Sequence, residues 1–161
     1  MNQYHIQNRP NREITSKDQI SDILKNGKYA VISMCCDNEP YIVSLSYGYD
    51  REKNALYFHS SRKGLKLDFI KANPHVCATV IEDGGYIADE CGHNYRTVVF
   101  WGNMTVVDDI NEKKHGMNIL LNHLENKEDV IKEKLLKSDS YYSKMEVIRL
   151  DIVQIHGKEG R

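Results

Sequence analysis

The stretch Leu56–Val80 constrains the fold more than any other part of the chain. It begins as an apolar strand and then passes Ser60 and Ser61, two residues typical of helix N-caps. A short helix follows, and Pro74 closes it, because the residue before a proline is pushed out of the helical region. The β-branched run Val76–Ile81 indicates another strand. The sequence therefore predicts a strand, a short helix and a second strand in close succession.

Three cations, Arg62, Lys63 and Lys66, gather where this helix begins. Positive side chains are unfavourable at a helix N-terminus, which is already the positive end of the helix dipole. Their placement is explained if an anion shares the site, because a phosphate can use free backbone N–H groups, serine hydroxyls and cationic heads together. A solvated basic helix face is the alternative interpretation of this cluster.

Six segments in all have the alternation or the β-branched composition that predicts strands. Short connections without regular crossover helices favour an antiparallel sheet, and closing that sheet into a barrel removes its exposed edges. A long loop is expected between Glu82 and Tyr95. The predicted strands are Tyr29–Cys36, Tyr41–Tyr49, Ala55–His59, Val76–Ile81, Thr97–Val107 and Met145–Ile155.

Three further helices are expected outside the predicted strands. The first spans Ser16–Asn26, starts with a capping box and ends at Gly27. The second is capped by Asp109 and carries an apolar stripe, and the third spans Lys127–Lys137. These helices are predicted to lie at the periphery of the barrel.

The length of 161 residues predicts a single domain over residues 16–161, preceded by a polar arm over residues 1–15. A net charge of −1 argues against a general nucleic-acid binder. Because no apolar run approaches the ~20 residues of a membrane helix and no signal peptide is visible, we expect a cytoplasmic protein without a membrane partner.

The cysteines and histidines give little indication of a metal. The four cysteines include no CxxC pair, so reduced thiols are expected. Cys91 and His93 have the spacing of two ligands of a zinc site. No further pair of ligands stands at a suitable spacing, so we predict that no metal is bound.

The segment SRKGLKL followed by NPHV resembles the pyridoxamine 5'-phosphate oxidase superfamily. The wider segment FHSSRKGLKLDFIKANPHVCATV is similar to the branch of FMN-binding split barrels that includes the nitroimidazole-resistance, or NimA-like, proteins. The resemblance implies a mainly β fold, a six-stranded antiparallel split β-barrel with peripheral helices. It also implies a homodimer with flavin at the interface, for which Val98, Phe100 and Met104 on the long strand Thr97–Val107 are the expected contact face.

The resemblance also implies where FMN is held. Ser61, Arg62 and Lys63 match the residues that contact the FMN phosphate in the oxidase pattern. The strand Tyr41–Ser46 matches the one whose backbone lines the flavin ring, although it can equally be a simple core strand. Thr97 takes the position of a serine in the family's YRSVxxxG strand and reaches the flavin from the partner subunit. The cofactor-binding residues predicted in this way are Val43, Ser44, Leu45, Ser46, His59, Ser60, Ser61, Arg62, Lys63, Gly64, Lys66 and Thr97.

His59 is the candidate catalytic residue, because the NimA-like branch often has a histidine at this place. A histidine beside a flavin can donate a proton or orient a substrate. The alternative is a strand-end histidine that bonds to the following loop. His156 stands near the C-terminus, where a related group of split-barrel proteins binds haem.

The sequence therefore predicts an FMN-binding flavoprotein that reduces small molecules such as nitro compounds. The flavin would perform the chemistry and the protein would supply binding and orientation. No G-x-G-x-x-G motif indicates a nicotinamide site. Two alternatives stay open: pyridoxamine 5'-phosphate oxidase itself, and a non-catalytic flavin- or haem-binding stress protein. The first is disfavoured because Arg149 and Arg161 are the only arginines after Arg96, and Trp101 is the only tryptophan.

Overall fold

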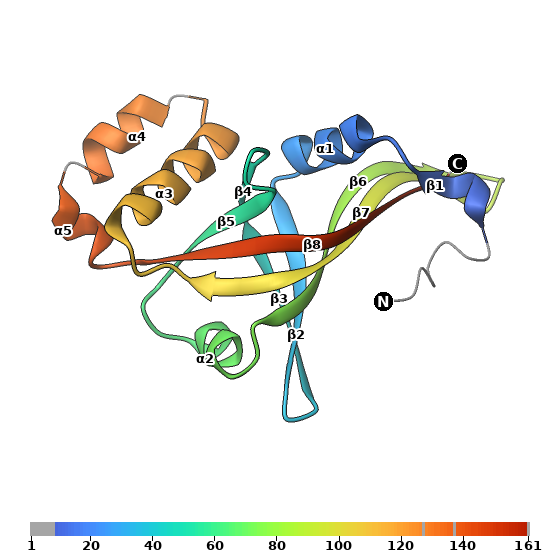
Figure 1. Cartoon of the computed structure of the whole chain (residues 1–161). Helices are drawn as coiled ribbons and strands as arrows, with labels where there is room; N and C mark the ends of the chain where they lie inside the picture. Colours follow the sequence, from blue (N-terminus) through green and yellow to red (C-terminus); the bar gives the residue numbers. More distant parts are fainter. Residues whose placement is uncertain (1–8, 127, 137, 161) are drawn as a thin grey trace.

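The computed structural model describes residues 9–126, 128–136 and 138–160 (Figure 1). The strands in this part of the chain are β1 (Glu13–Ile14), β2 (Tyr29–Cys36), β3 (Glu39–Ser46), β4 (Gly48–Asp50), β5 (Ala55–Ser60), β6 (His75–Ile87), β7 (Gly92–Val106) and β8 (Glu146–Gly160). The helices are the 3-10 turn η1 (Pro10–Arg12), α1 (Lys17–Asn26), α2 (Leu65–Ala72), α3 (Ile110–Leu124), α4 (Glu128–Leu135) and α5 (Asp139–Tyr142).

The strands form one antiparallel sheet in the order β3-β2-β6-β7-β8-β5-β4, and β1 pairs with β8. β3 and β4 stand at opposite ends of this order, yet only Tyr47 separates them along the chain. The sheet therefore curls back on itself, and one bent segment, Glu39–Asp50, pairs with β2 through its first half and with β5 through its second. Figure 1 shows α3, α4 and α5 gathered near one end of β8, with the β6–β7 hairpin at the other.

The predicted mainly β, antiparallel fold is confirmed, but the predicted number of six strands is wrong. Eight strands lie within the described residues. The predicted strand Tyr41–Tyr49 is divided at the fully buried Tyr47, where the backbone changes its pairing partner. Glu13 and Ile14, expected in a loosely attached arm, pair with Lys158 and Gly157, and Ile14 is buried. Residues 1–8 of that arm lie outside the described part.

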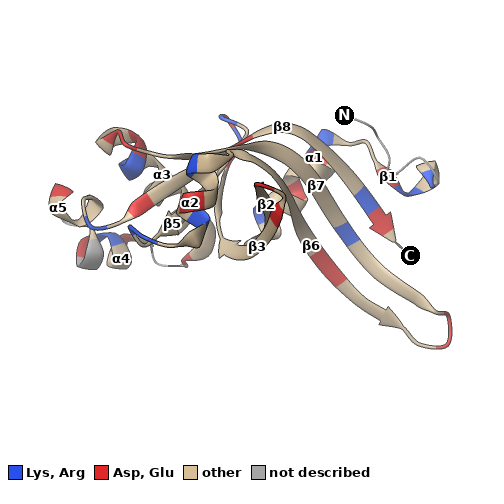
Figure 2. Ribbon diagram, turned by 90° about the horizontal axis from the view of Figure 1, so that it is seen from below, with Lys and Arg blue, Asp and Glu red and all other residues tan. Residues whose placement is uncertain are grey.

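The loop expected between Glu82 and Tyr95 is also wrong, because β6 and β7 continue through this region as a hairpin. The ladder tolerates the two glycines by a register shift between Asp83 and Gly85, where Gly85 adopts a φ of +91°. This hairpin projects from the body of the barrel (Figure 2), so its side chains need not be apolar. Its polar composition therefore resembles that of a loop.

The core lies inside the curled sheet and contains one side-chain row from each strand. Tyr47, Phe58 and Phe100 are fully buried there. Val98, Phe100 and Met104, expected at a subunit interface, are at most 1% exposed within the chain's own core, so that expectation is wrong. The opposite row of β7, which contains Val99 and Trp101, is partly exposed and faces outward.

The predicted caps of α1 and α3 are confirmed, and close packing seats α3 on the barrel. The Ser16 hydroxyl accepts a hydrogen bond from the Gln19 N–H at 3.4 Å, and the Asp109 carboxylate accepts one from the Glu112 N–H at 2.8 Å. α3 lies directly on β4 and β5, because Gly48 lets the strand backbone approach the backbone of α3 and Gly116 leaves room for the Tyr57 ring of β5. Within the described residues, no helix is long and apolar enough to cross a membrane.

Replacing Gly48 with alanine is predicted to destabilise the protein. The new Cβ would lie 2.5 Å from the backbone N and Cα of Leu120, so α3 would have to shift away from β4. We expect a loss of about 2–3 kcal/mol in the free energy of unfolding, measured by chemical denaturation. Gly92→Ala is the matched control, since the nearest atom to its Cβ would be in the Ile87 side chain at 3.4 Å, an ordinary van der Waals contact. Equal stability of the two variants would contradict the close-packing argument.

Candidate functional site

A cavity of about 510 Å³ lies between α3 and the edge of the barrel. The barrel side provides Ser44, Leu45 and Ser46 from β3 and His59 from β5, four of the residues predicted from the sequence. The helical side is mainly apolar. It consists of Met117, Leu120, Leu121, Leu124, Glu125, Ile131 and Leu136, with Met145 beside them. Strand and helix residues far apart in sequence thus enclose one mainly apolar space.

β3 lies at one end of the sheet order and pairs only with β2. An edge strand has backbone N–H and C=O groups on its free side that can bond to a ligand. Ser44 and Ser46 point outward and are exposed, whereas Val43 is half-buried against the core. Val43 can therefore reach a ligand only through its backbone, and Leu45 contributes both to the core and to the cavity.

His59 stands near the end of β5 and faces the cavity. Partial burial lowers the pKa of His59 below its ordinary value, and the positive charge of Lys66 lowers it further. The neutral imidazole is thus favoured near pH 7. A neutral ring can donate one hydrogen bond and accept another, which suits it to orient a polar group in the cavity.

The basic turn follows directly after His59. Ser60 is buried, and its hydroxyl donates to the carbonyl of Ser61 at 3.0 Å, while the Ser61 hydroxyl donates to the carbonyl of Lys63 at 2.9 Å. The N-cap of α2 is Gly64, so the expectation that the serine pair caps this helix is wrong. The serines instead shape the turn that presents Arg62 and Lys63.

The turn concentrates positive charge at a helix end that no side chain caps. Arg62 lies 3.8 Å from Glu146, and that carboxylate also pairs with Lys113 at 3.1 Å. Within the described part of the chain, Lys63 and Lys66 have no ion-pair partner. The turn also borders the cavity, because Ser60 pairs in the sheet with Glu146, the neighbour of the cavity residue Met145. An anionic group bound there would extend from the cavity.

Thr97 does not join this group within one chain. Its hydroxyl donates to the carbonyl of Val80 at 2.9 Å and contacts the Thr79 hydroxyl at 3.0 Å. β7 is three strands away from β3, which corresponds to about 14 Å at ordinary strand spacing. Thr97 nevertheless has an outward-facing register, because the buried Val98 beside it faces the core.

The other singled-out histidines have local partners. His156 contacts the side-chain amide of Gln154 at 2.7 Å, and its ring lies edge-on to Trp101. His93 pairs with Asp83 at 2.7 Å on the hairpin. Among the described residues, no group of three His, Cys, Asp or Glu side chains is arranged to hold a metal ion.

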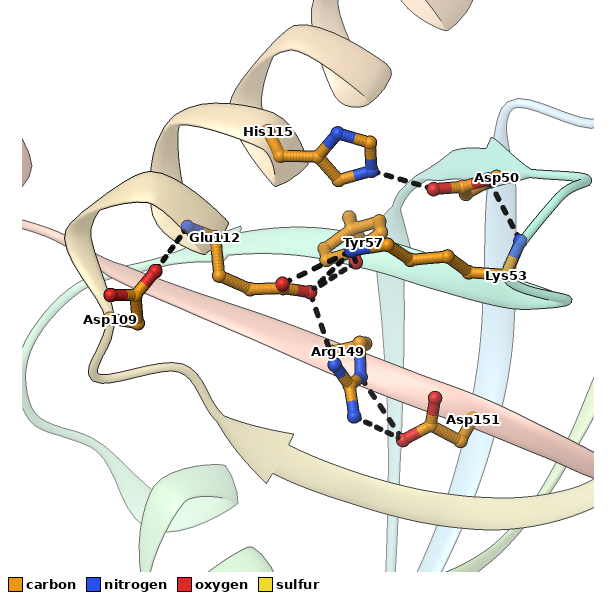
Figure 3. Close-up of polar contacts among 8 residues, drawn as sticks. All are labelled: Asp50, Lys53, Tyr57, Asp109, Glu112, His115, Arg149 and Asp151. Carbon is orange, nitrogen blue, oxygen red and sulfur yellow. Dashed lines mark hydrogen bonds and ion pairs between the residues drawn. The ribbon is translucent and has the colours of Figure 1, made fainter.

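Figure 3 shows a polar network beneath α3 that no sequence pattern indicated. The buried Tyr57 hydroxyl donates to Glu112 at 2.5 Å, and Lys53 and Arg149 each bond to the same carboxylate at 3.1 Å. His115, one turn further along α3, bonds to Asp50 at 2.6 Å. These residues come from three distant stretches of the sequence, 50–57, 112–115 and 149, so no local motif reveals them. Glu112 has only the sequence signature of a capping residue.

The network keeps its carboxylate ionised. The hydrogen bond from Tyr57, followed by those from Lys53 and Arg149, lowers the pKa of Glu112 to about 2 from its ordinary 4.5, against the opposing effect of burial. Burial and the bond to Glu112 raise the pKa of Tyr57, which therefore stays a phenol. The charged carboxylate and the neutral hydroxyl are the forms that make the shortest contact.

His123 fixes the other end of α3. Its Nε2 donates to the carbonyl of Gly27 at 2.5 Å, and its Nδ1 accepts from the backbone N–H of Tyr49 at 3.4 Å. The ring also packs against Tyr47, with centroids 4.9 Å apart. Burial lowers the pKa of His123, against the opposing effect of the bond to Gly27.

Comparison with known proteins defines the family. A family model described as pyridoxamine 5'-phosphate oxidase matches residues 16–159. The chain belongs to this family, and its fold is the split barrel expected from the sequence. A curated relative, an uncharacterized protein of Rhizobium meliloti (strain 1021), is 30% identical over 69 residues. That match covers 43% of this chain and 44% of the relative, so the chain spans less than half of the relative's length.

Solved structures share the fold at low sequence identity. A candidate 5-nitroimidazole antibiotic resistance protein of Bacteroides thetaiotaomicron is 22% identical, with a TM-score of 0.78 over 92% of this chain and 86% of that one. A flavocytochrome of Azotobacter vinelandii is 18% identical, with a TM-score of 0.78 over 99% and 72%. A FAD-binding protein of Mesorhizobium loti is 23% identical, with a TM-score of 0.67 over 93% and 96%.

Stability is predicted to fall as the pH drops below the ordinary histidine pKa of 6.5. The folded chain lowers the pKa of His59 and His123, so the unfolded chain binds more protons in this range. Their contribution is complete above pH 6.5 and is lost as the pH falls toward the folded-state values. The free energy of unfolding, measured with urea between about pH 5 and 8, should change less steeply with pH in His59→Gln and in His123→Gln than in the wild type. An unchanged slope in both variants would contradict the assignment.

Proposed function

We propose that this protein binds FMN and acts as a NimA-like reductase of small molecules. One observation carries the proposal: His59 lines the cavity together with Ser44 and Ser46, and the basic turn before α2 follows directly after His59 in the chain. The sequence predicted these two groups for the ring and for the phosphate of the same cofactor. A cavity of about 510 Å³ is of the ordinary size for a cofactor or small-molecule site.

The residues present fit each part of FMN. The phosphate needs cations and N–H donors, and the turn supplies Arg62, Lys63 and Lys66 beside an uncapped helix. The ring needs hydrogen-bonding groups along its polar edge and an apolar surface on its face. The free edge of β3 offers the first, and the apolar face of α3 offers the second. The chemistry of these groups supports FMN over a flavin without phosphate.

Bound FMN would supply the transfer of two electrons from a reduced donor to an acceptor. The chain's own residues then have separate tasks. Arg62 and Lys63 hold the phosphate, and the backbone of β3 orients the ring. The leucines of α3 exclude water from its face. The neutral His59 donates a hydrogen bond that orients the acceptor, a role that its lowered pKa supports better than proton donation.

Nitro compounds are the acceptors that we favour. The motivation is the sequence resemblance to the NimA-like branch, together with the shared fold of the Bacteroides thetaiotaomicron protein named for 5-nitroimidazole resistance. Pyridoxamine 5'-phosphate oxidase activity is less well supported, because Arg149 is bound to Glu112 and Asp151 and is not available to a substrate phosphate. Haem binding through His156 is also less well supported, since its ring already bonds to Gln154.

We further propose a homodimer formed through the outer face of β3, β2, β6 and β7. In register order, Ser44, Val31, Thr79 and Val99 form one row of this face, and none of them is buried within the chain. Thr97 lies on the same outer face, about 14 Å from β3. A second copy seated on this face can bring its own Thr97 to the first copy's cavity, which accounts for the separation of the predicted residues into two groups.

Lys63→Ala and Arg62→Ala are predicted to weaken FMN binding far more than riboflavin binding. Each variant loses a hydrogen bond to the charged phosphate, and this loss should lower the affinity for FMN roughly 10- to 150-fold. Riboflavin lacks the phosphate, so its affinity should stay nearly unchanged. Titrating apo-protein with both ligands measures the difference. The apo variants should be as stable as the wild type or slightly more stable, because a cation near a helix N-terminus is removed.

Lys71→Ala is the matched control for these variants. Lys71 is exposed in the last turn of the same helix, where a cation is favourable, and it lies away from the proposed phosphate. It should leave both affinities unchanged. Equal weakening of FMN and riboflavin by Lys63→Ala would show that this residue does not hold the phosphate, and the site assignment would fail.

Val99→Glu is predicted to convert a dimer into a monomer and to reduce flavin binding with it. The substitution places a charge on the proposed interface without changing the buried row of β7. Val130→Glu, on the exposed surface of α4, is the control and should remain a dimer. Sedimentation velocity at micromolar concentration is the measurement, and a flavin-loaded wild-type monomer would refute the dimer.

A further inference from the structure

The apolar face of α3 that lines the cavity is held between two polar attachments. Glu112 precedes that face and bonds to Tyr57, and His123 lies near its end, after Leu120 and Leu121, and bonds to Gly27. The interval of eleven residues corresponds to about 16 Å of helix, with Met117, Leu120 and Leu121 between the two ends. The position of these side chains over the cavity therefore depends on where the two attachments hold the helix.

Tyr57 connects the first attachment to the candidate site. It lies two residues before His59 on β5, so the two side chains point to the same side of the strand. The Tyr57 ring is fully buried against Gly116 of α3, and its hydroxyl makes the 2.5 Å bond to Glu112. One strand thus carries both Tyr57, which anchors α3 (Figure 3), and His59, which lines the same cavity as the apolar face of α3.

The anchor is stronger than an ordinary surface contact. Glu112 receives three charged or hydroxyl donors from Tyr57, Lys53 and Arg149, and its side chain is only 23% exposed. By contrast, Lys114 on the same helix pairs with Asp139 at 2.6 Å, and that partner is 72% exposed. Exposed ion pairs contribute little, whereas a partly buried carboxylate with several donors resists displacement.

We infer that Tyr57 and Glu112 are positioning residues that set the distance between the apolar face of α3 and His59. This inference rests on the proposed function, because it assigns the space between α3 and His59 to the flavin ring and its acceptor. Neither residue lines the cavity. Each acts through α3, so its loss should affect the ring-binding part of the site and leave the phosphate turn intact.

The test compares Tyr57→Phe, Glu112→Ala and their double variant. Tyr57→Phe keeps the buried ring and removes only the hydroxyl, so the fold is expected to persist. The two single changes should not add, because they remove the same bond. Glu112→Gln retains an acceptor for the Tyr57 hydroxyl and should restore much of the lost binding. Lys114→Ala is the control, since it breaks an ion pair of the same helix away from β5.

Two readouts separate positioning from general stability. The first is the affinity for FMN and for riboflavin, which Tyr57→Phe should weaken equally, by roughly tenfold. Loss of a cation from the basic turn should weaken the binding of FMN but not of riboflavin, so the two effects are distinguishable. The second is the pKa of His59, measured by NMR titration of the apo-protein. Burial lowers this pKa, and α3 lines the cavity that His59 faces, so we expect the pKa to rise in Tyr57→Phe, while the other charged groups at the site, Lys66 and Glu125, remain unchanged.

The inference is overturned if Tyr57→Phe loses stability while the His59 pKa and both flavin affinities stay at wild-type values. The bond would then be structural only. If the wild type binds no flavin, the proposed function fails. The His59 titration still decides whether Tyr57 and Glu112 set the position of α3 relative to His59. A shift of the His59 pKa in Lys114→Ala equal to that in Tyr57→Phe would likewise refute a specific role.

Discussion

The bent segment Glu39–Asp50 is the constraint on which the rest of the structure depends. Tyr47 forms the bend, is fully buried, and donates its hydroxyl to the carbonyl of Leu24 at 2.6 Å. Its ring packs near Phe58 and against His123, so the bend fixes the core, α1 and α3 together. Because the segment changes partners from β2 to β5 at this point, the sheet closes and β3 keeps one free edge.

That free edge and the seating of α3 create the candidate site together. Gly48, directly after the bend, lets the backbone of α3 approach β4 closely. The helix then covers the space beside β3 and His59, and the basic turn lies at its border. The cavity is apolar where α3 covers it, and the cations Arg62 and Lys63 lie in the turn that follows the cavity residue His59. An amphiphilic ligand with a ring and an anionic end matches this division.

Local sequence features predicted the elements whose structure is determined locally. The caps of α1 and α3, the end of α1 at Gly27 and the antiparallel class all depend on neighbouring residues, and the structure confirms them. The predicted residues Ser44, Leu45, Ser46 and His59 lie together because one bend and one helix bring them together, which the family resemblance anticipated. The assignment of these residues to a flavin is still a proposal.

Features that depend on distant contacts were not predictable in the same way. Both faces of β7 are apolar, with Val98 and Phe100 on one and Val99 and Trp101 on the other, so alternation alone cannot tell the core face from the outer face. The β6–β7 hairpin has the polar composition of a loop because it projects beyond the core. The Tyr57–Glu112 bond joins residues 55 positions apart and has no local signature.

The visible absorption spectrum of the purified protein shows directly whether the cavity and the basic turn bind FMN. We expect a flavin spectrum, with FMN released on denaturation in a ratio of about one per chain, or a flavin spectrum that forms when FMN is added to colourless protein. A haem spectrum would contradict it. So would a colourless protein that neither takes up added FMN nor changes the FMN spectrum.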